Sequence, residues 1–237
     1  MNRLCTICAR AGSKGVKNKN LLTIENVPLV GIAVLQALKS NLFTKVAVSS
    51  DSLEILSCAK EYGADITINR PPELASDLSG KIPAIQHAVK TVEELSQETF
   101  PILVDLDATS PLRLIEDIKG AVHMLESSGC DNVITGCPSK HSPYFSLVER
   151  KEDGFVELAK KSSSPILRRQ DAPECYDMNG AIYVWKHDQL FYNQALFRAR
   201  TQIFEMPQER SIDIDSIADL EMVRYLAHKN KRFTSVW

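Results

Sequence analysis

The sequence predicts an α/β fold in which a three-layer, doubly wound, mostly parallel sheet carries a small antiparallel insertion. Over the first 135 residues, short apolar segments alternate with helical patterns, as a parallel sheet with crossover helices requires. After about residue 136 this alternation stops, and prolines and glycines separate short alternating segments. The length of 237 residues suits one domain, which we place at residues 1–237.

The predicted strands are short and continuously apolar, which is typical of strands that helices cover on both faces. They are Leu4–Ala9, Lys45–Ser49, Asp65–Ile68, Ile102–Asp105 and Asn132–Thr135. Helices are predicted between them at Pro28–Ser40, Ser52–Tyr62, Lys81–Leu95 and Leu114–Ser128. Pro28 suits a first helical turn, and Gly63 and Gly129 are natural terminators.

The segment at about residues 138–178 is predicted to be the antiparallel insertion, with short strands within Tyr144–Glu149 and Phe155–Leu158. The chain then returns to the sheet with the apolar segment Ala181–Trp185 and ends in a helix near Ser216–Lys229. Because protrusions of this kind often carry subunit contacts, we expect the insertion to mediate dimerisation.

Composition excludes several classes of protein. The formal net charge of −2 removes the electrostatic argument for a nucleic-acid partner. No apolar run approaches the ~18–20 residues of a membrane span, and the first residues lack a signal-peptide pattern. We therefore expect a cytoplasmic protein without a membrane partner. Cys5 and Cys8 form a C-x-x-C pair, but they lie in a predicted buried strand, which favours packing over zinc or redox chemistry.

A basic loop follows the first predicted strand. Residues 10–20 contain four cations and no acid, namely Arg10, Lys14, Lys17 and Lys19. Gly12 and Gly15 would let the backbone approach a ligand, and Ser13 adds a donor. Ligands of open α/β sheets bind beyond the carboxyl ends of the strands, where this loop falls. The loop therefore predicts a polyphosphate site, although its spacing matches neither the P-loop nor the dinucleotide-binding motif.

Six segments together resemble one family, the CMP-sialic acid synthetases, which are cytidylyltransferases that activate nine-carbon 2-keto sugar acids. The segments are Ile7-Cys-Ala-Arg-Ala-Gly-Ser-Lys-Gly with Asn18-Lys-Asn, Ser49-Ser-Asp-Ser, Arg70-Pro-Pro-Glu-Leu-Ala-Ser-Asp, Thr109-Ser-Pro-Leu-Arg, Asn179-Gly-Ala-Ile-Tyr and Asp213-Ile-Asp. The first segment looks most like the branch that acts on legionaminic acids. The resemblance implies the nucleotidyltransferase version of the predicted fold.

The resemblance also implies a CTP site. Its triphosphate would contact the basic loop, and Asn20 and Arg70 would read the cytosine edge, which an amide and a guanidinium can satisfy. Without the resemblance, Arg70 would be interpreted as a surface arginine before two prolines. The implied CTP-binding residues are Arg10, Gly12, Ser13, Lys14, Lys19, Asn20, Arg70 and Ser79.

Two acidic pairs have the D-x-D spacing, Asp105 with Asp107 and Asp213 with Asp215. Side chains at i and i+2 share one face of a strand, and adjacent carboxylates repel unless a proton or a cation intervenes. Mg²⁺ prefers a few carboxylates together with phosphate oxygens, and the family places its metal at the second pair. An alternative for that pair is a helix cap before Ser216.

Asp107 departs from the family, because sialate-specific members commonly carry Gln at this position. A carboxylate cannot donate a hydrogen bond as an amide can, so the acceptor sugar must be contacted differently. This favours a relative of N-acetylneuraminate as the substrate. Three roles remain open for Asp107: contact with the sugar, binding of a second Mg²⁺, and deprotonation of the sugar hydroxyl.

The acceptor is an acid, so an arginine should meet its carboxylate. Arg168 and Arg169 are the candidates, and in the family a matching arginine comes from the inserted region of a partner subunit. The expected sugar-binding residues are Asp107, Lys140, Arg168, Arg169, Tyr176 and Asn179. We therefore expect a homodimer with shared sites.

The sequence thus predicts a cytidylyltransferase that transfers CMP from CTP to the anomeric hydroxyl of a nonulosonic acid, a legionaminic acid derivative, and releases pyrophosphate. The expected catalytic residues are Arg10, Lys19, Asp107 and Asp215, with Mg²⁺ as cofactor. The alternative is a metal-dependent nucleotide-sugar glycosyltransferase that uses Asp105-Leu-Asp107 as its D-x-D motif. A third interpretation is a catalytically inactive nucleotide-binding or assembly protein.

Overall fold

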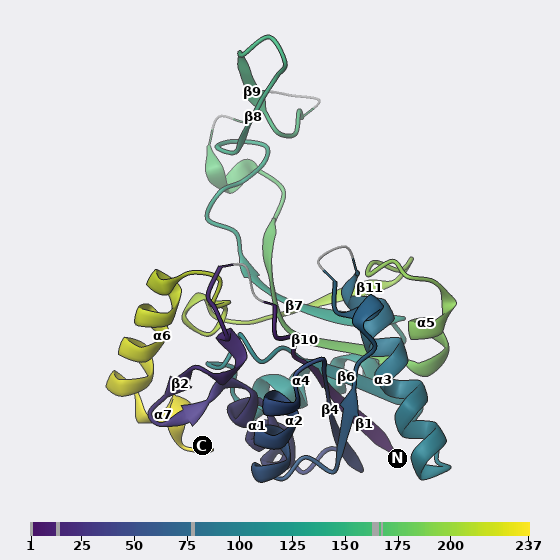
Figure 1. The fold of residues 1–237 in the computed structure, drawn as a ribbon. Helices are drawn as coiled ribbons and strands as arrows, with labels where there is room; N and C mark the ends of the chain where they lie inside the picture. The colour runs from purple at the N-terminus through teal and green to yellow at the C-terminus, as the bar shows by residue number, and fades with distance from the viewer. Residues whose placement is uncertain (1, 13–14, 77–78, 163–165, 167) are drawn as a thin grey trace.

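A seven-stranded mixed sheet forms the centre of the molecule, as the computed structural model shows in Figure 1. The structure describes residues 2–12, 15–76, 79–162, 166 and 168–237. The strand order is β11-β7-β10-β6-β1-β4-β5, and β10 alone runs antiparallel to its neighbours. After β1, the chain adds β4 and then β5 on one side of β1, and it then crosses over to add β6 on the other side. The topological switch point therefore lies between β1 and β6.

The strands of the central sheet are β1 (Arg3–Cys8), β4 (Lys45–Ser50), β5 (Ile66–Asn69), β6 (Ile102–Leu106), β7 (Asn132–Pro138), β10 (Tyr176–Lys186) and β11 (Thr201–Glu205). Two small hairpins pair β2 (Thr23–Ile24) with β3 (Val27–Pro28), and β8 (Val148–Arg150) with β9 (Val156–Leu158). The α-helices are α1 (Leu29–Ser40), α2 (Leu53–Glu61), α3 (Lys81–Ser96), α4 (Ile115–Ser128), α5 (His187–Tyr192), α6 (Ile217–Lys229) and α7 (Lys231–Thr234). Short 3-10 helices lie at Lys19–Leu21, Pro72–Leu74, Arg169–Asp171 and Gln208–Arg210.

Helices cover both faces of the sheet, which confirms the predicted three layers. Apolar residues of α1, α2 and α4 pack on one face, and those of α3 and α5 pack on the other. Alternate residues of a strand serve the two cores, as the side-chain alternation of a strand requires. Cys5 of β1, for example, faces the first core, whereas its neighbour Leu4 faces the second. A third cluster joins α6, α7 and the β2–β3 hairpin to the outer side of α1.

The predicted strands and helices all occur, and most boundaries agree within three residues. The exceptions are β10, which begins five residues before the predicted Ala181–Trp185, and β8, which overlaps only the end of the predicted Tyr144–Glu149. Besides the 3-10 helices, the elements that were not predicted are β11, α5, the β2–β3 hairpin and the short α7. Strand β11 lies at the edge of the sheet and is half-exposed, so it lacks the continuous apolar run that marks the central strands. Among the described residues, no helix combines the length and the apolar character that crossing a bilayer requires.

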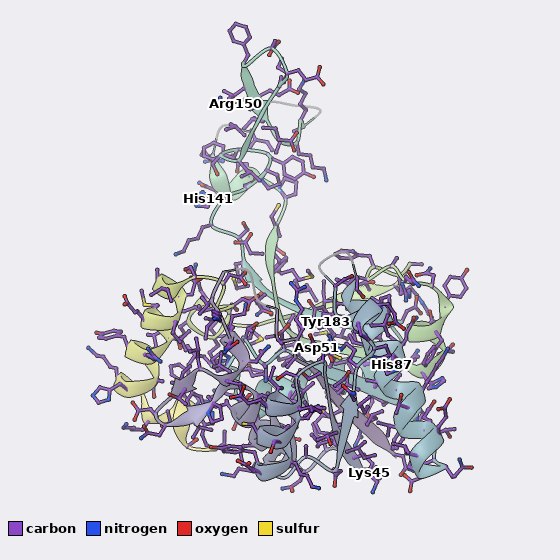
Figure 2. All side chains as sticks on the ribbon, in the orientation of Figure 1. Lys45, Asp51, His87, His141, Arg150 and Tyr183 are labelled. Atoms are coloured by element: carbon purple, nitrogen blue, oxygen red, sulfur yellow. The ribbon has the colours of Figure 1, made fainter. Side chains whose placement is uncertain are left out.

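The described residues of 139–175, namely 139–162, 166 and 168–175, form a protruding segment, the arm, which Figure 1 shows standing away from the sheet. Its stem is the end of β7 paired with the start of β10, where Tyr176 lies opposite Pro138. Its tip is the antiparallel β8–β9 hairpin, in agreement with the predicted antiparallel insertion. His141 and Arg150 belong to the arm, whereas Asp51 and Tyr183 lie in the body of the molecule (Figure 2).

Candidate active site

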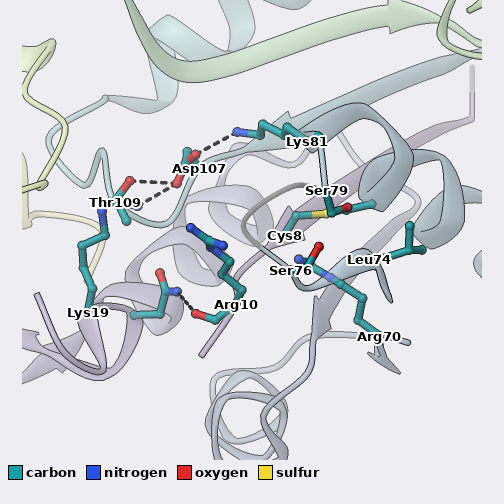
Figure 3. A pocket seen from close by; sticks show the side chains of 13 residues that line it. Cys8, Arg10, Lys19, Arg70, Leu74, Ser76, Ser79, Lys81, Asp107 and Thr109 are labelled. Carbon is teal, nitrogen blue, oxygen red and sulfur yellow. Dashed lines mark hydrogen bonds and ion pairs between the residues drawn. The ribbon is translucent and has the colours of Figure 1, made fainter. Parts of the chain in front are cut away.

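A cavity of about 260 Å³ opens at the carboxyl ends of β1 and β6, beside the switch point of the sheet. Ligands of doubly wound sheets bind at this position. The lining residues are polar or charged for the most part (Figure 3): Cys8, Arg10, Lys19, Asn20, Arg70, Leu74, Ser76, Ser79, Gly80, Lys81, Ala84, Asp107 and Thr109. Five of the eight residues predicted to bind CTP are among them, namely Arg10, Lys19, Asn20, Arg70 and Ser79.

The basic loop leaves the end of β1 and forms one wall of this cavity. Arg10 and Lys19 both line it, and the buried amide of Asn20 donates to the backbone carbonyl of Arg10 at 2.9 Å. That hydrogen bond ties the two ends of the loop together and fixes the direction of its cations. Ser13 and Lys14, which were predicted to bind the triphosphate, lie outside the described residues.

One glycine of the loop, Gly15, packs against the protein backbone. A Cβ atom on Gly15 would lie 2.1 Å from the backbone carbonyl oxygen of Asp215, which is closer than real Cβ contacts allow. Gly15 is therefore required where the loop packs against the Asp213–Asp215 segment. A Cβ on Gly12 would meet no atom within 4 Å. The close approach that the sequence assigned to a ligand is, at Gly15, an approach to the protein backbone.

Arg70 is buried, not a surface residue, and it follows the end of β5. Its Nη2 donates to the backbone carbonyl of Ser49 at 2.7 Å, and its Nε donates to the Ser49 hydroxyl at 3.2 Å. The end of β4 therefore holds the guanidinium at the cavity wall. Buried arginine is costly unless it is hydrogen-bonded, and these bonds satisfy part of that requirement.

The first acidic pair converges on a lysine that the sequence analysis did not identify. The ammonium of Lys81 lies 2.8 Å from Asp107 Oδ2 and 3.2 Å from Asp105 Oδ2. Asp105 is fully buried and accepts a hydrogen bond from the Thr6 hydroxyl at 2.8 Å. Asp107 Oδ1 accepts from the backbone N–H and the hydroxyl of Thr109. The two carboxylates do share one side, as the D-x-D spacing predicts.

These contacts set the charge states of the pair. Burial raises the pKa of Asp107, but Lys81 and the Thr109 hydrogen bonds outweigh it and lower the pKa to about 2. Burial lowers the pKa of Lys81, but Asp107 and Asp105 outweigh it and raise the pKa above its ordinary value. Both groups are therefore charged at neutral pH. A carboxylate with a pKa this low is a weak base, which disfavours the deprotonation role for Asp107.

The second acidic pair does not line the cavity itself but contacts two residues that do, Thr109 and Lys19. The Thr109 hydroxyl contacts Asp213 as well as Asp107, so one threonine links the two pairs. Asp215 pairs with Lys19 at 2.9 Å and is largely exposed. Burial and the neighbouring charge of Asp107 raise the pKa of Asp213. The alternative role as a helix cap belongs to Ser216, which caps α6 in a reciprocal box with Asp219.

Asp213 and Asp215 could bind a metal ion only if other ligands complete its coordination shell. Among the described residues, no three His, Cys, Asp or Glu side chains are grouped to hold a metal ion by themselves. Asp213 and Asp215 supply two carboxylates that repel each other, and Mg²⁺ favours such a set when phosphate oxygens complete its shell. The pair therefore fits Mg²⁺ together with a nucleotide.

The other residues predicted to bind sugar lie away from this cavity in the single chain. Lys140 and Arg168 are exposed on the arm, where Arg168 pairs with Asp171 at 2.8 Å, and Arg169 begins a 3-10 helix there. Tyr176 lines a separate cavity of about 590 Å³ at the base of the arm. The amide of Asn179 is used internally, since it accepts from the Thr135 hydroxyl at 2.6 Å and donates to the Ser211 hydroxyl at 2.9 Å.

Lys81, Thr109 and Arg113 were missed as contributors to the site. The fully buried Arg113 donates to the backbone carbonyls of Asp107, Ser110 and Ala181 and so fixes the loop that carries Asp107. Thr109 and Arg113 belong to a segment that the resemblance had singled out, so this signal was available. Lys81 follows Ser79-Gly80 at the start of a predicted helix, and its position relative to Asp107 depends on tertiary structure.

The C-x-x-C pair is structural. Cys5 is fully buried, and burial raises the pKa of both thiols above their ordinary value, with Asp105 adding to the effect. Thiols in this environment are poor nucleophiles, because nucleophilic attack needs the thiolate.

Comparisons with known proteins identify the family. The family model described as "Cytidylyltransferase" matches residues 4–235. The chain is 41% identical over 223 residues to the CMP-N,N'-diacetyllegionaminic acid synthase of Campylobacter jejuni, with 94% of each chain covered. It is equally similar, at 41% over 94% of each chain, to the post-translational flagellin modification protein B of Campylobacter coli.

A solved structure of CMP:2-keto-3-deoxy-manno-octonic acid synthetase complexed with CTP has a related fold. It superimposes with a TM-score of 0.65, covers 97% of this chain and 99% of its own, and is 19% identical. At 19% sequence identity, this similarity supports the fold of the chain but does not identify its substrate. The glycosyltransferase alternative is not favoured, because the carboxylates of its D-x-D motif are paired with Lys81 and the family model matches nearly the whole chain. The chain belongs to the cytidylyltransferase family.

Proposed function

We propose that this protein transfers CMP from CTP to the anomeric hydroxyl of a nonulosonic acid, a legionaminic acid derivative, and releases pyrophosphate. The observation that carries the proposal is the 41% identity, over 94% of both chains, to a relative named CMP-N,N'-diacetyllegionaminic acid synthase. The cavity supports it, because cations and carboxylates face each other there at the switch point of the sheet.

The reaction needs positioning and charge neutralisation more than covalent chemistry. The anomeric oxygen attacks the α-phosphorus in line, the bond from that phosphorus to the bridging oxygen breaks, and the electron pair leaves with pyrophosphate. The hydroxyl proton passes to solvent. Arg10 and Lys19 neutralise the charge that develops on the phosphate oxygens, and Asn20 and Arg70 hold the cytosine.

Asp213 and Asp215 are the residues that would hold Mg²⁺. The ion would screen the negative charge of the triphosphate and of the departing pyrophosphate. Asp213→Asn should raise the Mg²⁺ concentration needed for half-maximal pyrophosphate release by about tenfold, since one of two carboxylate ligands is lost. An unchanged Mg²⁺ requirement in this variant would contradict the assignment.

We further propose that the protein is a cytoplasmic homodimer in which the arm carries the contact. The arm exposes a row of large apolar side chains that a monomer would leave in water, with Phe155 at 72% and Val156 at 59% exposure. Arg168 and Arg169 of the partner subunit would then meet the carboxylate of the acceptor, with Lys140 and Tyr176 nearby. All described cysteines are free thiols, in agreement with a reducing compartment.

Light scattering during gel filtration tests the dimer. We expect a mass of twice the chain for the wild-type protein and a shift toward the monomer for Phe155→Ser with Val156→Ser. A wild-type monomer at working concentration would remove the role of the partner's arginines.

The reaction is tested by pyrophosphate release from CTP and Mg²⁺. The acceptors are N,N'-diacetyllegionaminate, N-acetylneuraminate, pseudaminate and 3-deoxy-octulosonate, and the nucleotide controls are ATP, GTP and UTP. We expect release with CTP and N,N'-diacetyllegionaminate and much less with the controls. Absence of release with every acceptor, despite bound CTP, would support the catalytically inactive interpretation.

A further inference from the structure

Lys81 is placed where a cation does not stabilise its helix. It is the first residue of α3, after Gly80, and the N-terminus of a helix disfavours positive charge. Its ammonium is instead stabilised by Asp105 and Asp107, and it lies 4.4 Å from the centre of the Tyr183 ring. Helix stability therefore does not explain a lysine at this position, which points to a role for Lys81 in the cavity.

The two carboxylates that hold Lys81 differ in their access to the cavity. The Asp105 side chain is fully buried, whereas about 27% of Asp107 and 30% of Lys81 remain exposed. Lys81 and Asp107 also both line the cavity, as Figure 3 shows. Asp105 therefore acts as an internal counter-charge, and the Lys81–Asp107 pair presents a hydrogen-bond donor and an acceptor 2.8 Å apart to whatever the cavity holds.

Lys81 supplies the hydrogen-bond donor that is lost where Asp107 stands in place of an amide side chain. An ammonium has three N–H donors; one donates to Asp107, and Asp105 is held as an ion pair at 3.2 Å. A further N–H of Lys81 and an unused lone pair of Asp107 can serve one ligand atom that both donates and accepts. A hydroxyl oxygen does both. A trans secondary amide does not, because its N–H and C=O point in opposite directions.

The pair also stands away from Asp213, a residue at which the proposed function places Mg²⁺ and the reacting phosphate. Hydrogen bonds and ion pairs run in the order Lys81, Asp107, Thr109, Asp213. Lys81 is at the end of this row opposite to Asp213, which is one of the carboxylates proposed for Mg²⁺. If the reacting phosphate lies at Asp213, as the proposed function requires, the part of the acceptor that reaches Lys81 is not its anomeric hydroxyl.

We propose that Lys81 and Asp107 together determine acceptor specificity, by binding one non-reacting hydroxyl of the sugar acid that donates to Asp107 and accepts from Lys81. The inference rests on the proposed function and adds to it a recognition element and the chemical group that this element reads.

The test combines variants with acceptor analogues. We would measure kcat and KM for N,N'-diacetyllegionaminate and for its 4-deoxy and 8-deoxy analogues with the wild-type protein, Lys81→Met and Asp107→Asn. For the wild type, loss of the recognised hydroxyl should lower kcat/KM by about 10- to 100-fold, the size expected for a hydrogen bond to a charged group. In both variants this penalty should fall to about twofold, while the KM for CTP stays within about twofold.

Lys90→Met is the matched control, because Lys90 is another lysine of α3 that lies over an aromatic ring, that of Phe191, but does not line the cavity. It should keep the wild-type response to both analogues. Lys81→Arg retains the charge and should keep part of the penalty. Since Lys81→Met leaves Asp105 buried without its cation, thermal unfolding and CTP binding are measured for every variant, and Asp107→Asn decides the question if Lys81→Met does not fold.

Two results would overturn the inference in an active wild-type protein. One is an unchanged penalty for both deoxy analogues in Asp107→Asn, and the other is a KM for CTP that rises as much as the KM for the acceptor. A wild-type protein that releases no pyrophosphate with this acceptor would instead contradict the proposed function, and the recognition role with it.

Discussion

Two lysines that line the cavity, Lys19 and Lys81, form ion pairs whose carboxylates differ in exposure. Lys81 pairs with two carboxylates, and the side chains of this group are 0% to 30% exposed. Lys19, whose side chain is 13% exposed, pairs with one carboxylate, Asp215, whose side chain is 76% exposed, so the greater exposure of this pair lies in its carboxylate and not in its lysine. An exposed pair contributes little to stability and can exchange partners, whereas a largely buried pair is costly to disturb. The Lys19–Asp215 pair is thus suited to an exchanging ligand such as a triphosphate, and the Lys81–Asp107 pair to a fixed recognition surface.

The largest expected effect on activity is at Lys19. Lys19→Ala should lower kcat/KM by about 100- to 1000-fold, since it removes one charge that stabilises the transferring phosphate. Thermal stability should change little, because the Lys19–Asp215 pair is exposed at its carboxylate. Steady-state kinetics and thermal unfolding of the same sample check both statements.

Lys17→Ala is the matched control, because Lys17 is an exposed cation of the same loop that does not line the cavity. Equal losses in the two variants would contradict a specific role for Lys19.

The Lys81–Asp107 pair should make the stability of the folded protein depend on pH in the acid range. The pKa of Asp107 is lowered to about 2, from an ordinary value near 3.8, so this carboxylate stabilises the folded state above pH 3.8. The contribution is lost as the pH falls from about 4 through 2, and it amounts to about 2 kcal/mol. Lys81 and Thr109 are the partners that lower this pKa, and Asp105 and Asp213 are the neighbouring acids. Denaturant unfolding should show a difference between wild type and Asp107→Asn that shrinks over this pH range. A difference that is constant from pH 5 to pH 2 would contradict the assignment.

A smaller effect is expected where the loop meets the second acidic pair. Gly15→Ala places a Cβ atom against the Asp215 carbonyl, so the loop must move away and carry Lys19 with it. We expect kcat/KM to fall by about tenfold, the cost of misplacing a charged group by a fraction of an ångström to one ångström. Gly12→Ala separates the steric cause from a ligand contact, because its Cβ would meet no protein atom within 4 Å and should therefore not displace the loop from Asp215. If Gly15→Ala kept full activity, the loop would tolerate displacement and its contact with Asp215 would not matter for the reaction.

The smallest effect concerns the stability contributed by the Lys19–Asp215 pair. Asp215→Asn should change the free energy of unfolding by no more than about 0.5 kcal/mol, the ordinary range for an exposed pair. Denaturant unfolding at low and at high salt measures this change. A loss of 2 kcal/mol or more would show that the two pairs are held equally firmly, and the contrast between them would disappear.

The arrangement of strands and helices followed from local patterns. The segment at Ile102–Leu106 is continuously apolar because helices cover both faces of the sheet, and that property can be read without the fold. Strand β11 was missed because an edge strand such as Thr201–Glu205 has no such run. The antiparallel direction of β10 was also not visible, since direction depends on where the chain returns and not on composition.

The sequence by itself determined the three-layer class, the basic loop, both acidic pairs and the arm, because each rests on residues that are close neighbours in the chain. Only the tertiary structure placed Lys81 between Asp105 and Asp107, buried Arg70 against Ser49, and brought Gly15 onto the Asp215 backbone. It also directed the amide of Asn179 into the interior, away from the role predicted for it. The physical reason is that these contacts join the ends of different strands, and the charge state and exposure of each group depend on neighbours that lie far away in sequence.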